Sequence, residues 1–98
     1  MKPKLTVALS ESDRTQSILY GRAKLENFDV EPQFLPVEDI FARQIVEPVF
    51  DVAELSLSSY LIALNQGEKR LTAIPAFLSR AFRHNAIYVR SDSPYVHP

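Results

Sequence analysis

The sequence predicts an α/β fold with a mainly parallel sheet and helices on its faces. Short apolar, β-prone runs alternate with segments whose apolar residues recur at helical spacing. Pro, Gly and short polar clusters separate the two kinds of segment. In chain order they give β-α-β-α-β-α-β-β, an alternation that favours parallel strands joined by right-handed crossovers.

Five β-prone runs are expected to form the strands. They cover residues 5–9, 30–35, 50–55, 71–77 and 86–89. Pro32 indicates that the second run starts at a sheet edge, and Pro75 marks an edge, bend or crossing in the fourth, because proline cannot donate to a strand ladder. Asn27 precedes the second run and is expected in a left-handed turn, which Asn tolerates better than most non-Gly residues.

A short first helix is expected after the first strand. It begins near Arg14, with Asp13 or Ser12 as its cap, and Gly21 ends it. Its inner face carries Ile18 and Leu19.

Two longer helices follow. Pro36 opens the second helix, and Pro48 ends it. Serines at 56–59 cap the third helix, and Gly67 closes it. The apolar stripes are Val37, Ile40, Phe41 and Ile45 in the second helix and Leu57, Leu61 and Leu64 in the third.

The composition excludes several classes of protein. The 98-residue chain is 46% hydrophobic with a net charge of −1, so it is no disordered tail and has no basic stripe for nucleic acid. It contains no Cys, which removes disulfides, a thiolate nucleophile and Cys-based metal sites. The apolar run behind the N-terminus stops at Leu9, too early for a signal-peptide core or a membrane span, so we expect a cytoplasmic protein.

The most polar segments follow three of the predicted strands. Residues 10–14, 54–59 and 78–84 come after the first, third and fourth strands, and ligands of open α/β sheets bind beyond the carboxyl ends of the strands. Helix N-termini and Arg side chains there favour a small anion, best a carboxylate. The candidate site residues are Asp13, Arg14, Glu54, Ser56, Ser58, Ser59, Arg80, Arg83 and His84.

Each candidate also has a structural interpretation. The serines are typical caps, Asp13 is another, and Arg80 with Arg83 suits a solvated pair. A lone His84 is more often structural than catalytic. Glu54 lies in an apolar strand and needs a partner if it is buried, so both roles stay open for it. Two histidines do not make a metal site, and no cofactor is predicted.

Four segments of the chain resemble the 4,5-dihydroxyphthalate decarboxylase family. They are residues 13–15, 38–41, 51–60 and 74–84, and the resemblance extends from residue 5 to about residue 92. It implies the two-lobed fold of type II periplasmic binding proteins, in members considerably longer than this chain. Residues 1–92 would then form a partial N-terminal lobe, and 93–98 a divergent or truncated tail.

The resemblance implies decarboxylation of 4,5-dihydroxyphthalate to protocatechuate and carbon dioxide. The position of the candidates on converging loops assigns Arg80 and Arg83 to a carboxylate clamp, His84 to proton donation, and Glu54 or Asp13 to the base. Arg14 and the three serines would complete substrate binding. No electron-sink cofactor is required, and metal dependence stays open.

Two alternatives remain. The chain could be a binding or sensing module that captures a small carboxylate without chemistry. It could also be a remnant lobe that pairs with a second copy through an open sheet edge, since unpaired edges invite association. The resemblance favours the enzyme family, but because it makes this chain an incomplete fragment, we expect the 98 residues alone to be inactive as a decarboxylase.

Overall fold

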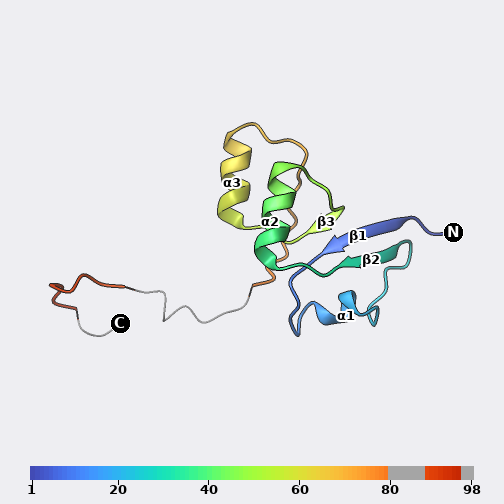
Figure 1. The fold of residues 1–98 in the computed structure, drawn as a ribbon, viewed down its shortest axis with the longest axis horizontal. Helices are drawn as coiled ribbons and strands as arrows, with labels where there is room; N and C mark the ends of the chain where they lie inside the picture. Colours follow the sequence, from blue (N-terminus) through green and yellow to red (C-terminus); the bar gives the residue numbers. More distant parts are fainter. Residues whose placement is uncertain (80–87, 96–98) are drawn as a thin grey trace.

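The structure is a computed structural model that describes residues 1–79 and 88–95. Its elements, in chain order, are β1 (Lys4–Ala8), α1 (Gln16–Leu19), β2 (Asp29–Gln33), α2 (Val37–Val46), β3 (Val52–Ala53) and α3 (Leu57–Asn65). The strands form one parallel sheet in the order β2-β1-β3 (Figure 1). The predicted α/β class is confirmed.

The central strand β1 pairs with very different lengths of chain on its two sides. It matches β2 over five positions, from Lys4 opposite Asp29 to Ala8 opposite Gln33. It matches β3 over two positions only, through Val52 and Ala53. Because β2 is an edge strand, a proline within it leaves no ladder hydrogen bond unmade, as the sequence indicated.

A small apolar core lies between β1 and α1. Val7, Leu9 and Leu19 are buried, with exposed fractions of 7% or less, and Leu5, Val30 and Leu78 pack against them. Leu19 therefore faces inward as predicted, whereas Ile18 beside it is 37% exposed. Ala8 and Ile40 are fully buried.

The first helix is shorter than predicted and its cap differs. Neither Asp13 nor Ser12 is the N-cap; Thr15 occupies that position without a side-chain cap hydrogen bond. Backbone bonds from Thr15 and Gln16 to the Ser12 carbonyl form a turn before the helix. The predicted stop is confirmed, because Gly21 adopts a φ of 72°, which a residue without Cβ reaches without strain.

Helix α2 begins at Val37 and ends at Val46, close to the predicted limits. Glu47 after it is extended (φ −149°, ψ 111°), the conformation that a residue before proline is forced to take. Gln44 is buried and pairs with the backbone of Phe50, donating to its carbonyl and accepting from its N–H, both at 3.1 Å. This pair holds the connection from α2 to β3.

Helix α3 is capped at Ser56 and closed at Gly67 (φ 89°), as the sequence predicts. It has no charged and no buried residue. Its leucines are exposed by 60%, 55% and 41% at positions 57, 61 and 64, so the apolar stripe of the helix lies open.

Several predicted features are absent from the part of the chain that the structure describes. Residues 71–77 do not form a strand, because a bend at Pro75, closed by a hydrogen bond from Ala76 N–H to the Ile74 carbonyl, turns the chain away from any ladder. The fifth strand, 86–89, lies partly outside the described residues, and 88–89 are not in a strand. Asn27 lies in a bend with negative φ, so the predicted left-handed turn at this residue is wrong.

No helix within the described ranges combines the length and apolar character needed to cross a bilayer.

Candidate functional site

The carboxyl ends of β1 and β3 meet at one edge of the sheet, and Glu54 is placed there by the backbone. Its N–H donates to the Ala8 carbonyl at 3.0 Å, which extends the parallel pairing one residue beyond β3. Its carboxylate oxygen Oε2 accepts two hydrogen bonds from Ser10, one from N–H at 2.7 Å and one from Oγ at 2.6 Å. The acid is half-buried, so this pairing offsets the loss of water around it.

The loop that carries Ser10 is held by Thr15, which is only 1% exposed. Thr15 Oγ1 donates to the Ser10 carbonyl at 2.6 Å and accepts from the Ser12 N–H at 2.9 Å. A hydroxyl that donates and accepts at once restricts the loop on both sides. The buried core beneath the loop and this network together orient Ser10 toward Glu54.

The segment after α3 returns to the same loop. Arg14 donates from Nε to the Leu78 carbonyl at 2.8 Å, and the Leu78 side chain packs against the β1–α1 core. The described parts of the three predicted segments are therefore brought together. Asp13, by contrast, has an 87% exposed side chain that pairs with Arg14 at 3.1 Å. It has no contact of this kind with Glu54.

The serine cluster at the start of α3 acts locally. Ser56 Oγ accepts from the Ser59 N–H at 3.5 Å, and it lies 3.0 Å from Ser58 Oγ. Ser56 therefore caps α3, in agreement with the structural interpretation of these serines.

The remaining candidates, Arg80, Arg83 and His84, lie outside the described residues.

Sequence reasoning missed a second hydroxyl–carboxylate pair, at the opposite end of β3. Asp51 Oδ2 accepts from Thr6 N–H and Thr6 Oγ1, both at 2.8 Å, and Asp51 N–H donates to Thr6 Oγ1 at 2.9 Å. The backbone hydrogen bond from Thr6, with the side-chain bond second, lowers the pKa of Asp51 below its ordinary value. The two-residue strand β3 is thus held at each end by a carboxylate bound to β1.

Ser10 was not singled out from the sequence either. The available signal was chemical: an acid in an apolar run requires donors, and the loop after the adjacent strand is where they would lie. Thr15 gave no comparable signal, because a threonine near a helix start is ordinary.

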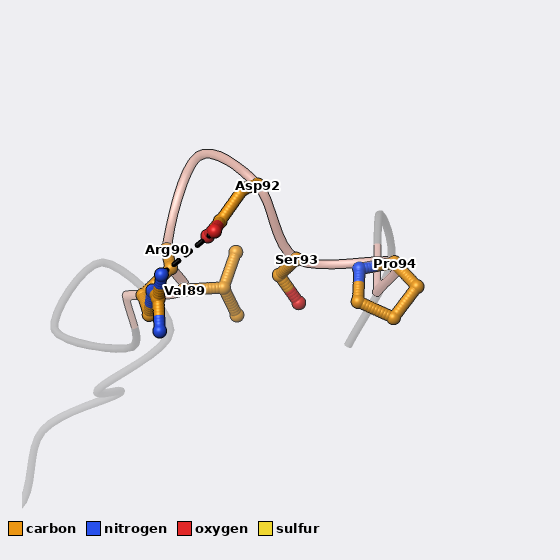
Figure 2. Close-up of a pocket in the computed structure, with 5 residues that line it drawn as sticks. All are labelled: Val89, Arg90, Asp92, Ser93 and Pro94. Atoms are coloured by element: carbon orange, nitrogen blue, oxygen red, sulfur yellow. Dashed lines mark hydrogen bonds and ion pairs between the residues drawn. The ribbon is translucent and has the colours of Figure 1, made fainter.

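Two hollows formed by described residues lie away from this edge. Figure 2 shows one of them, lined by Val89, Arg90, Asp92, Ser93 and Pro94, where Arg90 and Asp92 pair at 2.7 Å. All five come from one short stretch of chain.

A second hollow lies beside the C-terminal end of α3 and includes Glu68 and Arg70. The side-chain hydrogen bond from Arg70 lowers the pKa of Glu68 to about 2. These charges satisfy each other. Within the described ranges, no group of three or more His, Cys, Asp or Glu side chains is placed to hold a metal ion.

The chain is similar in sequence to two known decarboxylases. The chain is 36% identical over 91 residues to a 4,5-dihydroxyphthalate decarboxylase of Comamonas testosteroni. It is 35% identical over 91 residues to a 4,5-dihydroxyphthalate decarboxylase of Pseudomonas putida. The predicted resemblance is confirmed. Each match covers 93% of this chain. Both matches therefore include Ser10 and Glu54, which form the sheet edge described above and are called the Glu54 edge below.

The relatives are much longer than this chain. It spans 28% of the Comamonas decarboxylase and 35% of the Pseudomonas decarboxylase. No family model matches the chain.

Proposed function

We propose that this chain contributes part of the substrate site of an aromatic-acid decarboxylase whose substrate is 4,5-dihydroxyphthalate. The observation that carries the proposal is its similarity to two decarboxylases of that name over 93% of its length. The Glu54 edge supports it independently, because the acid lies beyond the carboxyl ends of parallel strands, where α/β folds bind ligands.

The chemistry needs an acid and a base but no electron sink. In 4,5-dihydroxyphthalate each carboxylate lies para to a ring hydroxyl. A base removes the phenolic proton while a donor protonates the ring carbon that bears the carboxylate, which gives a dienone. Cleavage of the carbon–carboxylate bond returns its electron pair to the ring, releases carbon dioxide and leaves a phenolate. That phenolate takes the proton back, so the products are protocatechuate and carbon dioxide.

Glu54 is the better placed of the two candidate bases. Ser10 holds one of its oxygens, and the carboxylate lies among the loops that converge at the sheet edge. Asp13 is exposed and paired with Arg14. Arg80 and Arg83 as the carboxylate clamp, and His84 as the proton donor, complete the proposal as assigned from the sequence.

Ligand binding by the chain tests the proposal first. Thermal unfolding with phthalate, 4,5-dihydroxyphthalate and protocatechuate should show a rise in Tm, because a ligand that binds the native state stabilises it by mass action. Succinate is the matched control, a dicarboxylate without a ring, and it should give no shift.

Turnover is tested by a graft. This chain replaces the matching 91 residues of the Comamonas testosteroni decarboxylase, and carbon dioxide release from 4,5-dihydroxyphthalate is measured. Activity in the graft that is lost in Glu54→Gln, by about 10²-fold or more, is the expected result for a general base. A graft that folds and binds the acid without turnover would instead support a binding module. Failure of both binding and turnover would refute the proposal.

A further inference from the structure

We propose that Ser10 and Glu54 form the part of the site that recognises a ring hydroxyl of the ligand. Ser10 is a positioning residue that holds the Glu54 carboxylate in place. The inference rests on the proposed function and adds to it that different parts of the site bind the hydroxyls and the carboxylates of the ligand. This edge of the sheet recognises a phenolic donor, and the carboxylates of the ligand are recognised elsewhere.

The two oxygens of Glu54 are in different situations. Oε2 accepts both the N–H and the Oγ of Ser10, at 2.7 and 2.6 Å. Within the part of the chain that the structure describes, no residue donates to Oε1. The side chain is only half-buried, so a ligand reaches it without unfolding the edge. Among the described residues, Ser10 thus occupies Oε2, and Oε1 can accept from a ligand.

An acceptor-only group selects for a donor. An ionised carboxylate accepts hydrogen bonds and donates none, so it cannot bond to another carboxylate and repels it. A phenolic O–H is a donor and suits this oxygen. A ligand with both groups would therefore bind with a hydroxyl toward Glu54 and its carboxylates turned away.

Hydrogen bonds to neighbouring residues hold Ser10 and Glu54 in this geometry. Thr15, almost fully buried, donates to the carbonyl of Ser10 at 2.6 Å and so restrains the residue that restrains Glu54. Glu54 N–H is also bonded to Ala8. The backbone on both sides of the carboxylate is fixed, which is the arrangement that makes a hydrogen-bonding site discriminate.

The chain contains a matched control for this pair. Thr6 binds Asp51 with the same two kinds of donor, N–H and hydroxyl, at 2.8 Å, and it too joins β1 to β3. Removing either hydroxyl weakens the attachment of β3 to β1, and Thr6→Ala is the more severe change because Thr6 Oγ1 also accepts from Asp51 N–H at 2.9 Å. Only the Ser10 pair lies at the carboxyl ends of the strands, so only its loss should change ligand preference.

The experiment compares two ligands that differ only in their ring hydroxyls. Isothermal titration measures the Kd of phthalate and of 4,5-dihydroxyphthalate for the wild-type chain and for Ser10→Ala, Glu54→Gln, Thr6→Ala and Ser10→Thr. A hydrogen bond to a charged group predicts that wild type prefers the hydroxylated acid by at least about 10-fold. Ser10→Ala should lower this preference by at least about 3-fold, because one of the two donors remains, and Glu54→Gln should abolish it. Thr6→Ala should leave the preference unchanged, and Ser10→Thr should retain it.

The outcomes separate the inference from the proposed function. If neither the wild-type chain nor its graft in the Comamonas testosteroni decarboxylase binds either acid, the proposed function fails and the inference fails with it. If the chain binds both acids equally, the aromatic-dicarboxylate function stands, and the proposed recognition of a ring hydroxyl by Ser10 and Glu54 is wrong. Equal loss of preference in Ser10→Ala and Thr6→Ala would show that both pairs act only through β3, which also overturns the inference.

Discussion

Replacing Gln44 should destabilise the chain more than any other substitution of a polar residue in α2. The side chain is 5% exposed, and its amide makes two hydrogen bonds of 3.1 Å to the backbone of Phe50. Because β3 begins two residues after Phe50, this pair also determines where Glu54 lies. The substitution therefore connects stability to the candidate site.

The expected magnitude follows from these contacts. Two lost hydrogen bonds contribute about 1 kcal/mol each, more where Phe50 groups stay without water. The methylene at Cγ, which Gln44→Ala also removes, adds about 0.8 kcal/mol. Gln44→Ala should thus lower the free energy of unfolding by about 3 kcal/mol, and Gln44→Met, which keeps the methylene, by about 2 kcal/mol.

Urea unfolding followed by circular dichroism at 222 nm measures both variants against wild type. Gln44→Glu is a useful third variant, since its carboxylate still accepts from the Phe50 N–H but meets the Phe50 carbonyl without a donor. Its destabilisation should shrink as the pH falls and the acid becomes a donor. A Gln44→Met chain within about 0.5 kcal/mol of wild type would refute the reasoning, because it would show that the two bonds add nothing beyond packing.

Three further predictions concern the pairs around this site. The pKa of Asp51 is lowered in the folded chain, so its contribution to stability is present at neutral pH and lost as the pH falls through that lowered value; Asp51→Asn should flatten the acid limb of a pH–stability curve, and an unchanged limb would contradict this. The pKa of Glu68, held near 2 by Arg70, should rise toward its ordinary value in Arg70→Ala, as followed by carboxyl-carbon NMR; a wild-type value near 4.5 would exclude the pair in solution. Ser56→Ala removes the cap of α3 and should lower its stability by about 0.5 to 1 kcal/mol, the low end of the range because the bond is 3.5 Å long, whereas Ser56→Thr should retain most of it by helical circular dichroism.

The features that sequence reasoning predicted well depend on local backbone rules. Gly21 and Gly67 end helices because both adopt positive φ, and Pro32 lies at a sheet edge because it has no N–H. Ser56 caps α3 for an equally local reason. In each case the residue type restricts the chain within a few positions, so no distant partner is needed for the prediction.

The features that it missed depend on partners distant in sequence. Ser10 and Glu54 are 44 residues apart, and Thr6 and Asp51 are 45 apart. In the sequence, neither residue of a pair indicates which residue its partner is, although an acid in an apolar run indicates that some donor is near. The fourth strand failed for a related reason: residues 71–77 have the composition of a strand, but a strand also requires a neighbour in the sheet, and Pro75 turns the segment away. Asp13 was a reasonable cap on composition and instead pairs with Arg14.

The return of the chain from α3 to the first loop has a consequence for synthesis. Arg14 and Leu78 are bonded across 64 positions, and Leu78 covers the core cluster of Val7, Leu9 and Leu19. During translation the first strand and its loop are made early but cannot be sealed until residue 78 has emerged. Contacts of such long sequence separation form slowly, because the loop entropy is lost before the contact is gained. The core cluster under the first loop therefore stays uncovered until residue 78 has been made, and exposed apolar surface of this kind favours aggregation while it lasts.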